Sequence, residues 1–177
     1  MNSLIRRGCF ETNSSSVHAI IIQKQNVKPY LYEGQILFIE HHDFGWSPEY
    51  FSEPSTLASY YCEWLIHSSY DEDKGKWKKR ITERLNNFAD IMYKNGVTVD
   101  FPEDYIRFNG WGGLVEGYID HVSELDEFFE PMEHHEKRLL TYIFGPENYI
   151  ETGNDNSDNA YPSMDNPEGT DLYVKGN

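Results

Sequence analysis

The polar side chains best suited to chemistry are concentrated near the N-terminus. Between Glu11 and His18 the chain places a carboxylate, an amide, four hydroxyls and an imidazole within eight residues. On an extended chain, Ser14, Ser16 and His18 would project from one face, with neighbouring sites about 7 Å apart. A serine activated by a histidine usually takes its partners from distant parts of a chain, so this spacing is weak support for catalysis.

The same motif has a structural interpretation. Asn and Ser side chains bond nearby backbone groups and build turns, so the segment could simply fix the path of the chain into the strand that follows. We expect this role first, and the spacing leaves a ligand or partner site and a catalytic site open. The candidate residues for such a site are Glu11, Asn13, Ser14, Ser16 and His18.

The remaining metal-capable side chains have poor spacing. Two adjacent histidines on a helix point about 100° apart and cannot readily face one ion. We therefore expect no metal site and no cofactor from the candidate groups, which are His41 and His42 with Asp43, Glu63 and His67 beside Cys62, and His134 with His135. The many carboxylates of the second half show no spacing that singles out an acid–base pair.

The N-terminal motif also carries a resemblance. The run from Phe10 to Ser16, with His18 after it and an arginine a few residues before it, resembles the N-terminus of a group of small uncharacterised proteins from bacterial genomes, especially Firmicutes, and from their phages. The segment 142–155 is similar as well. No established activity comes with that group. A phage origin implies a role in countering host defence, by analogy with other compact acidic inhibitors.

Charge is distributed unevenly along the chain. Of the formal net charge of −15, residues 1–84 contribute 11 acidic and 10 basic side chains, whereas residues 85–177 contribute 19 acidic and 5 basic ones. The second half should repel nucleic acid and attract basic surfaces. We therefore expect a protein partner with a basic surface and no direct nucleic acid binding, although acidity can also serve solubility alone.

Composition and length predict a soluble protein with one domain. A chain of 177 residues can bury a sizeable core without disulfides. Its two cysteines have no paired spacing, and no apolar run approaches the ~20 residues that span a bilayer. We expect a location in the cytoplasm of a bacterial host cell and no membrane association. No pattern in the sequence indicates an oligomeric state.

The hydrophobic pattern predicts an α+β fold over 1–177, with a small, mostly antiparallel sheet and four to five helices. Strands are expected at 17–23 and 35–40, paired as an antiparallel hairpin, and at 148–151 and 172–174. Helices are expected from Ser55, over 76–94, and over 123–130 and 132–144, the last two divided at Pro131. A hairpin or bulge is expected at 109–113 and a polar loop at 152–170.

The leading functional hypothesis is an acidic binding protein of a phage or mobile element that inhibits a host protein, such as a defence or nucleic-acid-binding protein, by direct contact. Its interface candidates are Glu124, Asp126, Glu127 and Glu130, with Leu125, Phe128 and Phe129 facing inward from the same helix. The alternative is an enzyme acting on a nucleotide or similar ligand, with the motif from Glu11 to His18 as its site. A scaffold protein without a site is the third possibility.

Overall fold

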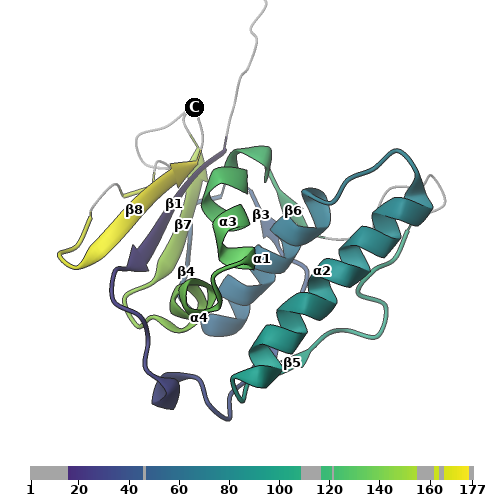
Figure 1. The fold of residues 1–177 in the computed structure, drawn as a ribbon. Helices are drawn as coiled ribbons and strands as arrows, with labels where there is room; N and C mark the ends of the chain where they lie inside the picture. Colours follow the sequence, from purple (N-terminus) through teal and green to yellow (C-terminus); the bar gives the residue numbers. More distant parts are fainter. Residues whose placement is uncertain are drawn as a thin grey trace, which may run out of the picture.

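A four-stranded antiparallel sheet forms one side of the molecule, and helices pack against it (Figure 1). The computed structural model describes residues 16–45, 47–108, 117–120, 122–154, 162–163 and 166–175. The sheet has the order β4-β7-β1-β8, from β4 (Glu49–Phe51), β7 (Tyr149–Asn154), β1 (Ser16–Gln23) and β8 (Thr170–Lys175). Helices α1, α3 and α4 lie between this sheet and α2. The α+β class expected from the sequence is confirmed.

Strand β1 is the buried centre of the sheet. Its β-branched run is buried from Ser16 to Ile22, as expected for a strand with neighbours on both edges. The register places Ile20 opposite Ile150 of β7 and opposite Tyr173 of β8. The predicted strand at 17–23 is confirmed, as are those near 148–151 and 172–174.

The predicted hairpin between 17–23 and 35–40 is wrong. Strand β2 (Ile36–Phe38) pairs in parallel with β5 (Thr98–Asp100), and β3 (Asp43–Phe44) pairs in parallel with β6 (Tyr118–Ile119). Both edges of β1 are already taken by β7 and β8. In β2 only Leu37 is buried, between two exposed neighbours, so this strand suits a small peripheral sheet.

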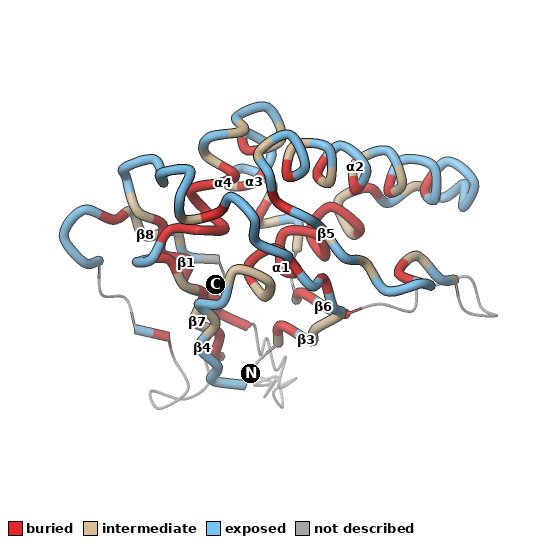
Figure 2. Tube along the Cα trace, turned by 90° about the horizontal axis from the view of Figure 1, so that it is seen from below, coloured by how far each residue is buried: buried red, intermediate tan, exposed pale blue. Residues whose placement is uncertain are grey.

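Helices α1 (Pro54–His67) and α2 (Lys74–Lys94) have different environments. Every residue from Leu57 to Ile66 of α1 is buried, which places this helix in the centre of the molecule (Figure 2). Helix α2 buries one stripe and is otherwise exposed, as its sequence pattern predicts. Its ends are set by the Asp73 side chain, which accepts from two backbone N–H groups, and by Gly96 at φ 75°.

Two predicted helix boundaries are wrong. Ser55 does not cap α1, since Pro54 already occupies its first turn and the Ser55 hydroxyl accepts from the backbone of Phe38 at 3.1 Å. Pro131 lies inside α3 (Asp126–Glu133), and the break before α4 (Glu136–Phe144) falls at 134–135. Pro131 has no N–H to bond the carbonyl four residues earlier, yet α3 continues for two residues past it, where the buried side chains of Phe129 and Met132 hold the helix in the core. Two 3-10 turns, η1 (Pro29–Leu31) and η2 (Val122–Leu125), complete the order of elements.

Aromatic rings fill the space between the sheet and α2. Tyr61, Trp64 and Tyr142 each contact Phe129 of α3, with ring centroids 5.2 to 5.3 Å apart. Such pairs add specific geometry to apolar burial and lock α1, α3 and α4 together.

Among the described residues, no helix is both long and apolar enough to cross a membrane. The predicted hairpin or bulge at 109–113 and positions 155–161 and 164–165 of the predicted loop at 152–170 lie outside the described residues, while 152–154 belong to β7 and not to a loop. Within that loop, the backbone N–H of Ser163 donates to Glu151 Oε2 at 2.9 Å.

Candidate functional site

Two of the five motif residues chosen from the sequence lie in the described part of the chain. Ser16 begins β1, and its backbone N–H donates to Asp120 Oδ2 at 3.2 Å. His18 follows on the same strand, and both residues are fully buried. The structure therefore brings Ser16 and His18 into the interior. The other three candidates, Glu11, Asn13 and Ser14, lie outside the described residues.

His18 is held by a tyrosine of α1. Its Nδ1 lies 2.7 Å from the hydroxyl oxygen of Tyr60. Burial, with a smaller contribution from Tyr173, raises the pKa of Tyr60, so this hydroxyl keeps its proton. Within the described residues His18 Nδ1 is the acceptor available to that hydroxyl, so Tyr60 donates and the imidazole accepts. This bond fixes the central strand to the central helix.

The four acidic interface candidates divide into two kinds. Asp126 is half-buried, and its Oδ1 accepts from Trp64 Nε1 at 2.8 Å, so it supports the fold. Glu124 is also half-buried, whereas Glu127 and Glu130 are exposed. Of the predicted set, therefore, Glu127 and Glu130 present their side chains most fully to solvent.

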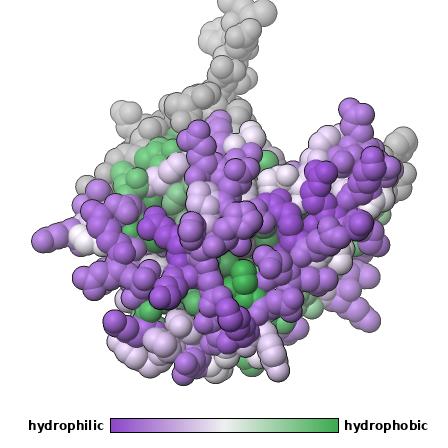
Figure 3. Space-filling view, in the orientation of Figure 1, coloured by the Kyte–Doolittle hydropathy of each residue, from purple (hydrophilic) through white to green (hydrophobic). Residues whose placement is uncertain are grey.

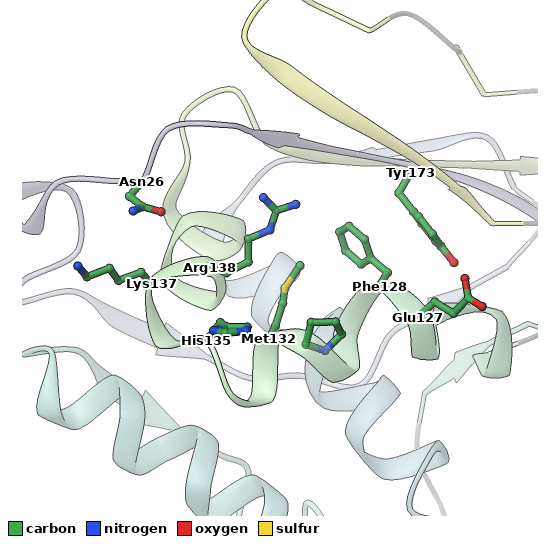
Figure 4. A pocket seen from close by; sticks show the side chains of 9 residues that line it. Asn26, Glu127, Phe128, Met132, His135, Lys137, Arg138 and Tyr173 are labelled. Atoms are coloured by element: carbon green, nitrogen blue, oxygen red, sulfur yellow. The ribbon is translucent and has the colours of Figure 1, made fainter.

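A groove of about 660 Å³ lies between the α3–α4 pair and β8 (Figure 4). Its apolar lining includes Phe128, Pro131 and Met132 from α3 and Tyr173 from β8. The rings of Phe128 and Tyr173 are stacked, with centroids 4.7 Å apart and an interplanar angle of 27°. The expectation that Phe128 faces inward with Leu125 and Phe129 is only partly right, because Phe128 is half-buried and lines the groove.

The two ends of the groove carry opposite charges. Figure 4 shows Lys137 and Arg138 at the end near Asn26, and Glu127 at the other end beside Tyr173. Lys137 and Glu127 are exposed, while Arg138 is half-buried. In the described part of the chain, none of the three charged side chains forms an ion pair or a hydrogen bond. The groove therefore has two cations at one end and one anion at the other, with an apolar centre between them, and among the described residues none of the three charges is paired.

The negative end extends beyond one residue. Burial raises the pKa of Tyr173, and the carboxylates of Glu127, Glu124 and Asp126 raise it further in that order. A second hollow of about 440 Å³ shares Glu127 and Pro131 with the groove and is lined also by Glu130, Glu133 and His134. Acidic side chains therefore continue around α3 from the end of the groove.

Away from the groove, the most polar part of the interior surrounds Glu63 of α1. This carboxylate is fully buried, and its Oε1 accepts from His41 Nδ1 at 2.6 Å. His41 Nε2 lies 3.1 Å from the backbone oxygen of Tyr105, so both ring nitrogens lie within hydrogen-bond distance of oxygen atoms. His67 Nε2 lies 3.3 Å from the backbone oxygen of Gly117 and 3.8 Å from Glu63 Oε2.

This polar cluster connects several loops to α1. A Cβ at Gly117 would lie 2.2 Å from the backbone oxygen of His42, so only glycine allows this close approach. In the described residues, no group of three or more His, Cys, Asp or Glu side chains is arranged to hold a metal ion. The arrangement is a short hydrogen bond that ties Glu63 and His41 together within the fold.

The chain matches no family model, and neither the curated proteins nor the solved structures contain a match to it. The class of protein is therefore defined by the fold and the groove alone: it is an α+β protein with an open groove that carries both positive and negative side chains.

Sequence reasoning missed the groove. Its floor combines Met132 with Tyr173, which are 41 positions apart in the numbering, and no local pattern connects them. One signal was available for the basic end. Lys137 and Arg138 are adjacent in a second half that holds only five basic residues against 19 acidic ones, so a basic pair there stands out from its surroundings.

Proposed function

We propose that this chain is a protein-binding module that acts by direct contact through the groove between α3, α4 and β8. One observation carries the proposal: the groove has a stacked aromatic pair, Phe128 and Tyr173, in its lining and opposite charges at its two ends that have no ion-pair partner among the described residues. A half-buried guanidinium such as that of Arg138 has lost part of its hydration without gaining a carboxylate. A partner that brings an anion to this end would form a strong charge-assisted bond.

The occupant that best suits such a groove is a polypeptide. A peptide segment offers basic, apolar and acidic side chains in a row, which a small ligand of one charge does not. The face seen in Figure 3 is mostly hydrophilic, with hydrophobic surface over the region of β8 and in a smaller patch near the centre of the view. Exposed aromatic and apolar side chains surrounded by polar ones are typical of protein interfaces.

The charge of the chain supports a basic partner. The second half of the sequence holds nearly all of the net charge of −15, and part of it is presented by Glu127 at one end of the groove and by Glu130 in the adjoining hollow. Such a surface speeds encounter with a basic protein and disfavours nucleic acid. The N-terminal resemblance to small bacterial and phage proteins supports extending the proposal to inhibition of a host protein by this contact.

For the alternative, an enzyme with its site at the N-terminal motif, the described residues of that motif offer no support. A ligand would have to reach Ser16 and His18, which are fully buried, and His18 is already bonded to Tyr60.

The proposal is tested by capture from a Firmicutes lysate with three versions of the tagged protein. The groove variant combines Glu127→Lys with Arg138→Glu, which preserves net charge. The matched control combines Glu72→Lys with Lys74→Glu, at exposed positions by the start of α2, remote from the groove. We expect a stoichiometric partner with the natural protein and the control, and at least a tenfold loss with the groove variant. A partner retained by a groove variant with unchanged circular dichroism would overturn the proposal.

A further inference from the structure

Strand β8 is an edge of the sheet, next to the groove. It pairs with β1, and in the described part of the chain no strand lies on its other side. Such an edge presents backbone N–H and C=O groups that can bond a further strand. Tyr173 projects from β8 into the groove, so the edge and the groove adjoin.

We propose that the partner contributes an extended segment that adds to β8 as an antiparallel strand, with side chains in the order basic, apolar, acidic. This inference rests on the proposed function and specifies how the groove is occupied. In strand addition the main chain supplies affinity, and pockets for alternate side chains supply specificity.

The order of side chains along the partner segment follows from the direction in which β8 runs between the basic and the acidic end of the groove. Gln23 at the end of β1 pairs with Thr170 at the start of β8, and Asn26 follows three residues after Gln23. The end of the groove at Asn26 and Arg138 therefore lies toward the start of β8. Tyr173 lies further along the strand, beside the acidic end.

An antiparallel segment would run the opposite way. It would begin at the acidic end, where a basic side chain meets Glu127, and finish at the basic end, where an acidic side chain meets Arg138. Between them an apolar side chain would cover the rings of Phe128 and Tyr173. Parallel pairing is slightly less stable per residue than antiparallel pairing, which favours this order.

The charge of the chain favours a different protein as the source of the segment. Because the chain carries a net charge of −15, a second copy approaches it with like charge, whereas a basic protein is attracted to it.

The test uses the full chain and two synthetic peptides with blocked ends. The forward peptide is Lys-Lys-Val-Leu-Val-Glu-Glu and the reverse peptide is Glu-Glu-Val-Leu-Val-Lys-Lys, which have identical composition. In an extended forward peptide, the Lys, Leu and Glu at the second, fourth and sixth positions share the face toward the groove. Fluorescence anisotropy should give at least tenfold tighter binding of the forward peptide. The Glu127→Lys, Arg138→Glu variant should prefer the reverse peptide, whereas the Glu72→Lys, Lys74→Glu control should keep the original preference.

A second measurement tests the strand pairing itself. N-methyl groups on alternate peptide nitrogens should abolish binding in one register and leave it unchanged in the other, because only alternate amides face β8. Hydrogen exchange of the β8 amides should slow when the forward peptide is added. Equal binding of both peptides, no binding of either at millimolar concentration, or no protection of β8 would overturn the inference. If the peptide experiments fail but the captured partner is lost with the groove variant, the proposed function still holds. If the groove variant retains the partner, both the proposed function and the strand addition are wrong.

Discussion

Arg84 of α2 and Glu133 of α3 form a two-pronged ion pair. Arg84 Nε lies 2.9 Å from Glu133 Oε2, and Arg84 Nη2 lies 2.6 Å from Glu133 Oε1. The guanidinium also lies over the ring of Trp64, 4.7 Å from its centroid. Arg84 therefore connects α2 to the acidic half of the chain, while the lysines of α2 at positions 74, 76, 78 and 79 are exposed.

We expect Arg84→Met to lower the free energy of unfolding by about 3 kcal/mol, because Glu133 would keep a partly buried charge without its partner. Denaturant unfolding measures this loss. The companion variant Arg84→Met, Glu133→Met removes both charges and should recover a large part of it. Losses that simply add between the two sites would contradict the pairing.

Tyr60→Phe should destabilise the protein by about 1 to 3 kcal/mol, because it removes the donor bonded to the buried ring of His18. Thermal unfolding of Tyr60→Phe is compared with that of Tyr93→Phe, at a position that is 82% exposed, where a change within about 0.5 kcal/mol is expected. An unchanged midpoint for Tyr60→Phe together with lost partner binding would instead make His18 part of a functional site.

His41→Ala should cost about 3 kcal/mol, because it leaves the fully buried carboxylate of Glu63 without the ring nitrogen that lies 2.6 Å from its Oε1. Adding Glu63→Gln to this variant removes the uncompensated charge and should restore part of the stability. A double-mutant cycle from chemical denaturation gives the coupling. A coupling near zero would show that the two groups do not act as a pair.

Glu136 should make stability depend on pH. Hydrogen bonds from Lys94 and Asn95 lower the pKa of Glu136 below its ordinary value. A carboxyl with a depressed pKa in the folded state contributes stability at pH above its unfolded pKa of about 4.3, and this contribution is lost as pH falls through the folded value.

The variant Glu136→Gln should therefore be less stable than the natural protein by about 0.5 kcal/mol at pH 7, since the pair is partly solvated, and equally stable at pH 2. Unfolding curves from pH 7 to pH 2 measure this difference. The matched variant Glu72→Gln should show no such pH dependence. A difference for Glu136→Gln that persists undiminished at pH 2 would rule out the charge as its cause.

Substitutions of the acidic residues of α3 should fall into two groups, one that lowers stability and one that slows association with the partner. Asp126→Ala should lower stability by about 1 to 2 kcal/mol, because the indole N–H of Trp64 loses its acceptor. The pair Glu127→Gln, Glu130→Gln should leave stability within about 0.5 kcal/mol and slow association with the partner.

Association rates to the captured partner should fall as salt rises, since the screening length is about 8 Å at physiological ionic strength. Stopped-flow or surface-based kinetics at low and high salt provide the measurement, with Glu72→Gln, Glu83→Gln as the control of equal charge change. Rates that respond neither to salt nor to Glu127 and Glu130 would leave the acidic half as a solubility device.

The sequence by itself determined the local elements of this protein. The β-branched run after Ser16 predicted β1, and the apolar stripe of α2 with its stop at 95–96 predicted that helix within two residues of its observed start. These features follow from hydrophobic periodicity and from backbone preferences over a few residues, which a sequence displays directly. Pro131 shows the limit of such rules, since packing of Phe129 and Met132 keeps α3 helical past it.

Only the tertiary structure decided which elements meet. The run of buried residues in β1 predicts a strand with neighbours on both edges, but it does not indicate which strands these are. The two neighbours, β7 and β8, lie more than 100 residues later in the chain. The same holds for the stack of Phe128 on Tyr173, for Arg84 with Glu133 and for His41 with Glu63. These side chains come together because the fold buries apolar groups and pairs charges over the whole chain. Such tertiary contacts produce no periodic pattern in the sequence near any one of the residues.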